Sequence, residues 1–152
     1  MAATLPASQE PPTPTAYAAD LELATRGLLS LTVAVLEDME KRVGPATLRA
    51  LQSLQRLGPC LVTELGADLA LPPSTASRLS DRLAEAGFIT RRVAPHNRRA
   101  TQLELADAGQ AILDELVAQR VARFDAVIEQ MSGRERDQLL AGAAAFTVAY
   151  NR

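Results

Sequence analysis

The chain has 152 residues, of which 47% are apolar and 22% are charged. This length fits one domain, and the composition is that of a globular protein that buries about two-thirds of its unfolded surface. No segment approaches the roughly 20 apolar residues that cross a bilayer, and the N-terminus lacks a basic segment followed by an apolar one. We therefore expect a cytoplasmic protein with no membrane partner.

The chain contains one cysteine and one histidine. A lone cysteine excludes an intramolecular disulfide, and with a single histidine it leaves no zinc site of the Cys-rich type. Cys60 follows Gly58-Pro59 and precedes two aliphatic residues, which favours a buried packing residue over a redox sensor. We expect no metal and no cofactor.

Residues 1–17 carry proline and threonine without apolar periodicity, which predicts a disordered tail. A single domain is then expected over residues 18–152. Apolar residues recur at steps of three and four through residues 18–43, so we expect a long amphipathic helix that stops before Gly44-Pro45. Its stripe consists of Leu21, Ala24, Leu28, Leu31 and Val35.

Two shorter helices are predicted next. The spacing of Leu48, Leu51 and Leu54 indicates a second helix that ends at Gly58-Pro59. A third is expected from Glu64 to about residue 70, with Thr63 as its N-cap. A minimal strand near residues 60–62 is expected to pair with the hairpin described below.

Residues 74–86 predict a helix with two contrasting faces. At about 3.6 residues per turn, apolar side chains gather on one face and polar ones on the other. The apolar face carries Ala76, Leu79, Leu83 and Ala86, and the polar face carries Ser74, Arg78, Asp81, Arg82 and Glu85. Gly87 then supplies a left-handed residue that ends the helix.

A charged hairpin is predicted after this helix. Residues 88–93 have the β-branched and aromatic composition of a strand. Thr101, Leu103 and Leu105 alternate with polar residues, as in a strand buried on one face. Residues 94–99 between them form a turn-rich loop that ends in Arg98 and Arg99. A helix followed by such a hairpin is the order of elements in a winged helix-turn-helix.

Two further helices complete the chain. The fifth is marked by Ile112, Leu116, Phe124, Val127 and Met131. Ser132-Gly133-Arg134-Glu135 is a capping-box pattern that opens the sixth. The sixth is striped by Leu139, Ala143, Phe146 and Tyr150. We expect a mainly α fold with a small antiparallel β-wing, in the order α-α-α-α-β-β-α-α.

The net charge of −2 and the pI near 5.4 are unusual for a protein that binds DNA. However, residues 74–101 contain six arginines and two acidic residues, whereas the rest of the chain has ten basic and sixteen acidic residues. Phosphate contacts depend on nearby cations, so this local charge outweighs the global value. The arginines of the helix and hairpin favour a nucleic-acid interface over a merely solvated face.

The terminal helices carry more apolar residues than their stripes require, namely Leu23, Leu29, Val33, Leu36 and Leu140. A second copy of the chain is the natural cover for them. A two-fold dimer would present two helices to major grooves about 34–36 Å apart, and hence bind a palindromic site. The alternative is a monomer that packs these leucines internally.

Three segments resemble the MarR (multiple antibiotic resistance regulator) family of bacterial transcription regulators: LPPSTASRL at 71–79, LAEAGFI at 83–89, and NRRA at 97–100 leading to Leu105. The resemblance covers about residues 20–150. It implies a homodimer with dimerisation helices in residues 18–43 and 107–152. It also implies a winged helix-turn-helix head in residues 46–106.

The same resemblance implies the DNA contacts. The helix at 74–86 would enter the major groove, and Arg99 would enter the minor groove. The contact residues that we expect are Ser74, Thr75, Ser77, Arg78, Arg82, Asn97, Arg98 and Arg99.

The chain departs from the family pattern at three positions. Asn97 replaces the aspartate that usually stands two positions before the minor-groove arginine, so a neutral amide replaces the carboxylate that would orient Arg99. Pro72 and Ala106 stand where the family often has Ser and Thr as helix caps, and a lost cap typically costs about 1 kcal/mol. We expect Asp107 to cap the fifth helix instead.

No catalytic motif stands out. Acidic residues are spaced among arginines on helix surfaces, and there is no glycine-rich phosphate loop or zinc-protease motif. We expect a sequence-specific regulator that is not an enzyme, most simply a repressor released from its operator by a small ligand or an oxidant. Family members often bind phenolic or other aromatic carboxylates. The alternative is a winged-helix protein-interaction module without specific DNA binding.

Overall fold

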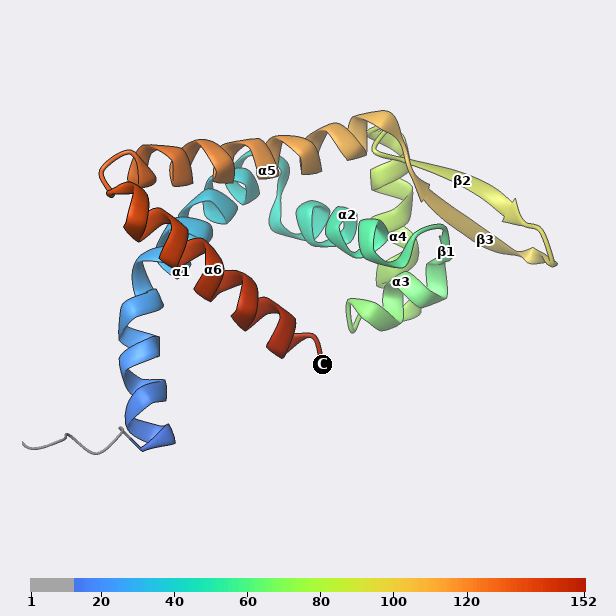
Figure 1. The fold of residues 1–152 in the computed structure, drawn as a ribbon. Helices are drawn as coiled ribbons and strands as arrows, with labels where there is room; N and C mark the ends of the chain where they lie inside the picture. The colour runs from blue at the N-terminus through green and yellow to red at the C-terminus, as the bar shows by residue number, and fades with distance from the viewer. Residues whose placement is uncertain (1–12) are drawn as a thin grey trace, which may run out of the picture.

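The computed structural model describes residues 13–152 and is mainly helical, with one small antiparallel sheet (Figure 1). This architecture confirms the fold class expected from the sequence. The elements, in chain order, are α1 (Pro14–Val43), α2 (Pro45–Leu57), β1 (Cys60–Leu61), α3 (Val62–Asp68), α4 (Pro73–Glu85), β2 (Ile89–Ala94), β3 (Asn97–Leu105), α5 (Asp107–Ile128) and α6 (Gly133–Tyr150).

Helix α1 begins earlier than the sequence predicted. It starts at Pro14 and not after Tyr17, because the Thr13 hydroxyl accepts a hydrogen bond from the Ala16 N–H at 3.3 Å and proline suits a first helical turn. The rest of the predicted tail, residues 1–12, lies outside the described residues. The other end is as expected, since Gly44 adopts a φ of +88° and ends the helix.

Helix α3 also begins before its predicted start. Leu61 is the N-cap residue and Thr63 lies inside the helix, so the predicted Thr63 cap is wrong. The cause is the Glu64 carboxylate, which accepts the Leu61 N–H at 2.6 Å and satisfies a donor that the first turn leaves free. The short strand before α3 is confirmed, because Cys60 pairs with Leu103 of β3.

The sheet has the strand order β1-β3-β2, with both pairings antiparallel. The predicted loop of residues 94–99 is too long, because Ala94 still pairs with Asn97 across the hairpin. Only Pro95 and His96 therefore turn the chain. Arg98 and Arg99 lie at the start of β3, beside the tip of the hairpin.

The starts of the last two helices differ in how they are capped. The Asp107 cap that we predicted for α5 is wrong, since Ala106 is the N-cap residue and no side chain caps this helix. The predicted capping box of α6 is confirmed: Ser132 Oγ accepts the Glu135 N–H at 3.4 Å, and the Glu135 carboxylate accepts the Ser132 N–H at 2.8 Å.

The hydrophobic core connects the C-terminal part of α1 with α2, α3, α4, the sheet and the first half of α5. Its largest fully buried side chains are Val35, Met39, Leu48, Leu51, Leu54, Leu65, Leu83 and Leu103. Helix α5 runs from the hairpin to the far end of the molecule, where α6 turns back and diverges from α1 (Figure 1). Among the described residues, no helix is both long and apolar enough to cross a membrane.

Candidate nucleic-acid interface

Helix α4 has the two faces that the sequence predicted. Ala76, Leu79 and Leu83 are buried against the core, whereas most of the proposed contact residues of this helix are exposed: Ser74, Thr75, Arg78 and Arg82, with Ser77 half-buried. Ala86, predicted on the apolar face, is instead the exposed C-cap residue. The helix thus presents a polar surface of hydroxyls and guanidinium groups.

Ser80 is a buried residue of α4 that the sequence pattern did not reveal. It is 0% exposed, and its hydroxyl donates to the Ser77 carbonyl at 2.8 Å. A buried serine is tolerated here because its polar atom has a partner within the same helix.

Helices α3 and α4 pack closely as the helix-turn-helix pair. A Cβ at Gly66 would lie 2.9 Å from the Cβ of Ala76, so a side chain at position 66 would push the two helices apart. Both residues are buried. Two small residues therefore set the distance between the supporting helix and the helix that exposes the arginines.

A polar cluster attaches α3 to α2. The Ser53 hydroxyl donates to the Asp68 carboxylate, and Arg56 Nη2 lies 2.7 Å from the same carboxylate. The hydrogen bonds from Arg56 and Ser53 hold the pKa of Asp68 below its usual range. The sequence pattern did not reveal this cluster, although Ser53 and Arg56 are spaced to share one face of a helix.

The arginines of this region fall into two groups. Arg91 forms an ion pair with Asp81 of α4, and Arg92 Nη2 lies 2.9 Å from Glu104. These pairs neutralise the carboxylates of Asp81 and Glu104. By contrast, the structure gives no ion pair, within residues 13–152, to Arg78, Arg82, Arg98 or Arg99. All four are exposed.

Asn97 stabilises the backbone at the hairpin tip. Its side-chain oxygen accepts the Arg99 N–H at 3.0 Å, the local bond by which asparagine favours a turn. The amide therefore fixes the main chain that carries Arg99. It makes no hydrogen bond to the guanidinium.

Cys60 is buried between the head's helices and sheet, as the sequence predicted, with 4% of its surface exposed. Burial, together with the carboxylates of Glu64 and Asp68, raises the pKa of its thiol. Its thiol is therefore a poor nucleophile at neutral pH. Within the described part of the chain, no three His, Cys, Asp or Glu residues are grouped so that they could hold a metal.

The chain is similar in sequence and in fold to known transcriptional regulators. A statistical model of the MarR family matches residues 45–101. The chain is 33% identical to the helix-turn-helix transcriptional repressor MdtR of Bacillus subtilis over 105 residues, which is 68% of each chain. The crystal structure of Bacillus subtilis YusO superposes with a TM-score of 0.67 at 28% identity, covering 91% of this chain and 99% of YusO.

A further solved structure has the same fold at lower identity. It is a MepR variant of S. aureus bound to an oligodeoxyribonucleotide, with a TM-score of 0.63 and 15% identity over 88% of this chain and 97% of MepR. The helix pair, the hairpin and the exposed arginines define a winged helix-turn-helix protein. The chain belongs to the MarR family, whose members are transcriptional regulators and not enzymes.

Proposed function

We propose that the chain is a sequence-specific repressor that binds a palindromic operator in double-stranded DNA as a homodimer and leaves it when a small ligand binds. The observation that supports this most is the set of four exposed arginines, on α4 and at the hairpin tip, that form no ion pair with any residue the structure describes. A guanidinium without a protein partner is available for phosphate and base contacts.

On this proposal α4 lies in the major groove. Arg78 is the base reader, because a guanidinium can bond guanine bidentately, and Ser74, Thr75, Ser77 and Arg82 line the same face. Arg99 enters the minor groove, while Asn97 and Arg98 contact the adjacent backbone. The oligodeoxyribonucleotide bound by MepR, which shares the fold, supports a DNA-facing role for these elements.

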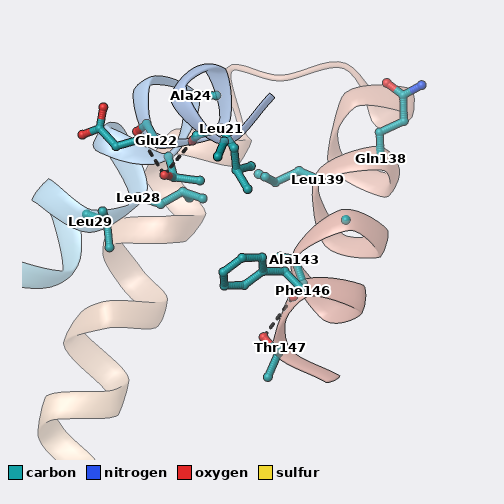
Figure 2. A pocket seen from close by; sticks show the side chains of 13 residues that line it. Leu21, Glu22, Ala24, Leu28, Leu29, Gln138, Leu139, Ala143, Phe146 and Thr147 are labelled. Atoms are coloured by element: carbon teal, nitrogen blue, oxygen red, sulfur yellow. Dashed lines mark hydrogen bonds between the residues drawn. The ribbon is translucent and has the colours of Figure 1, made fainter. Parts of the chain in front are cut away.

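The terminal helices support a homodimer. No residue of α6 is buried in the single chain, and large apolar side chains such as Leu140 and Phe146 are 72% and 59% exposed. A groove of about 640 Å³ separates α1 from α6. In Figure 2, Leu21 and Leu28 face Leu139 and Phe146 across it. A second copy with the same apolar helices would cover these surfaces.

A smaller cavity of about 380 Å³ suits an effector with an apolar body and an anionic group. Val43, Leu83 and Phe88 contribute apolar surface, and Arg82 contributes a cation. An aromatic carboxylate placed there would pair with Arg82. Because Arg82 also lies on the proposed DNA-facing surface, the bound ligand would remove one contact to the operator.

Selection of bound genomic fragments, followed by mobility-shift titration, tests the proposal. The wild-type protein should enrich a sequence with two inverted half-sites. The Arg78→Ala/Arg99→Ala double variant should lose that binding. Arg134→Ala is the matched control, because Arg134 is an exposed arginine at the start of α6.

A wild-type protein that stays folded and enriches no sequence would support the alternative, a protein-interaction module built on a winged-helix scaffold.

A further inference from the structure

The C-terminal end of α4 is tied to Phe88. Gly87 adopts a φ of +75°, and its N–H donates to the Ala84 carbonyl at 3.0 Å. The Phe88 N–H donates to the Leu83 carbonyl at 2.9 Å. These bonds close the helix and leave little freedom between α4 and the Phe88 peptide group.

The carbonyl of Phe88 contacts the residues where α5 begins. It accepts the Ala106 N–H at 3.0 Å. Gly109 is buried against the same carbonyl: a Cβ at position 109 would lie too close to Phe88 O for non-bonded atoms, and 3.2 Å from both the Phe88 carbonyl carbon and Leu105 Cδ2.

The requirement for glycine at this position is one of space. Gly109 has no positive φ and lies within a helix, so its conformation is open to any residue. The obstructing atoms at Phe88 are backbone, which cannot move aside as the end of a flexible side chain can. Any side chain at position 109 must therefore change the position of α5 relative to Phe88 and α4.

Helix α5 carries such a change away from the head. Its 22 residues make a rod about 33 Å long. The rod is held to α1 by the ion pair between Arg42 and Glu115, and its later residues Val117, Val121 and Val127 are exposed. Figure 1 shows α5 joining the corner beside β2 and β3 to the turn that leads into α6.

We propose that Gly109, through its contact with the Phe88 carbonyl, sets the angle between α4 and α5 and so determines the half-site spacing that the dimer accepts. Gly109 is thus a positioning residue for operator specificity that touches no DNA. This inference rests on the proposed function, because spacing has meaning only for two heads on one operator. In a two-fold dimer the same displacement occurs in both heads, so the distance between the two α4 helices changes by the sum of the two displacements.

A library of paired half-sites with variable spacing tests the proposal. Gly109→Ala should keep the bases selected within each half-site but shift the preferred spacing by about one base pair, which is a rise of about 3.4 Å. Gly133→Ala is the matched control, since a Cβ there meets nothing within 4 Å. An unchanged spacing profile for Gly109→Ala would overturn the inference.

A second variant breaks the hydrogen bond to the same carbonyl, because the proline ring carbon takes the place of the donated hydrogen and must move Phe88 O away. Ala106→Pro removes the N–H that donates to Phe88 O, at a residue whose φ of −89° lies near the range that proline adopts. It should broaden the spacing preference, and it keeps the inference testable if Gly109→Ala does not fold.

Spin labels measure the head-to-head distance without DNA. Glu85→Cys in a Cys60→Ser background places one label at the exposed end of each α4. Pulsed dipolar spectroscopy should then give a shifted distance for Gly109→Ala and a broader distribution for Ala106→Pro. Wild-type distances in both variants would refute the role of Gly109. A wild-type protein that selected no paired half-sites would refute the proposed function, whatever the spin-label distances.

Discussion

Every buried hydrophobic residue of the described chain lies within residues 35–116, whereas α6, at the other end of the chain, contributes none. Leu48, Leu51 and Leu54 of α2 are at most 2% exposed, but Leu140 of α6 is 72% exposed. The contrast concerns packing and not composition, because both helices are rich in leucine and alanine. It indicates that the core, which includes parts of α1 and α5, is stabilised by contacts within one chain, and it supports the proposed dimer, in which a second copy would bury the apolar side chains of α6.

Removing α6 should have the largest effect on the oligomeric state and on specific DNA binding. A chain truncated after Met131 should be monomeric at micromolar concentration and lose specific DNA binding, because the proposed interface disappears. The head should stay folded, since its core contains no residue of α6. Analytical ultracentrifugation and circular dichroism check both expectations. A truncated chain that remained dimeric would contradict the assignment of the interface, and a variant lacking residues 2–12 is the control.

Arg99→Ala should have the next largest effect. A lost charge-assisted contact costs about 1.5–3 kcal/mol, which corresponds to roughly a 10- to 150-fold weaker affinity for the operator. The slope of log affinity against log salt should fall by about one, and the preference for A·T-rich flanks should decrease. Arg92→Ala is the control, because Arg92 is already paired with Glu104. Titrations at several salt concentrations compare the two variants.

Asn97→Asp tests whether the orientation of the Arg99 guanidinium or the net charge of the hairpin tip matters more for DNA binding. In the wild-type protein the Asn97 side-chain oxygen accepts the Arg99 N–H. An aspartate keeps this acceptor and adds a negative charge that can pair with the Arg99 guanidinium. We expect a higher operator affinity, since a better-fixed Arg99 outweighs one added negative charge. A lower affinity at every salt concentration would show that bulk charge dominates at the hairpin tip.

Arg78→Ala should have a smaller and more local effect. Preference at one base position in each half-site should fall by about 1–3 kcal/mol, while the other positions keep theirs. Binding-site selection with the variant measures this directly. Identical base preferences in the variant and the wild type would exclude Arg78 as a base reader.

Acid should weaken the attachment of α3 to α2. Because the pKa of Asp68 is lowered by Arg56 and Ser53, its contribution to stability is present above the unfolded pKa, near 4, and is lost as the pH falls through the folded value. Asp68→Asn should therefore lower the melting temperature at neutral pH and flatten its decline in acid. Thermal unfolding between about pH 3 and 7 tests this, and an unchanged pH profile would argue against the cluster.

Cys60→Ser should have the smallest effect on regulation. The thiol is buried and its pKa is raised, so peroxide should release the operator equally from the variant and the wild type. Loss of an oxidant response in a variant that keeps its stability and DNA affinity would instead make Cys60 a sensor.

The sequence predicted those features that repeat along the chain. Helical periodicity located α1 to α6 within a few residues and separated the buried Leu79 and Leu83 from the exposed Arg78 and Arg82. The local excess of arginine located the candidate interface. Both depend on neighbours in sequence, where the spacing of a helix or strand decides which side chains share a face.

Features that depend on contacts between distant segments were missed. The Asp81–Arg91 pair separates the hairpin arginines into paired and unpaired groups, yet neither residue type identifies its partner. Gly109 resembles any helical glycine until Phe88 is placed beside it. The cap error at Asp107 has a similar origin, because the Phe88 carbonyl, distant in sequence, accepts the Ala106 N–H where α5 begins. The error at Thr63 is local, because the Glu64 carboxylate accepts the Leu61 N–H three residues earlier.

The central claim is that a homodimer places its two α4 helices on the two halves of one palindromic operator. Hydroxyl-radical footprinting of the operator selected by the wild-type protein tests this claim most directly. We predict two equivalent protected segments related by a two-fold axis, with centres about 10–10.5 base pairs apart or a multiple of that distance, and protected minor grooves flanking them. Substituting Arg99 by alanine should remove only the minor-groove protection. A single protected segment, or protection without two-fold symmetry, would contradict a dimer that places two α4 helices on one operator.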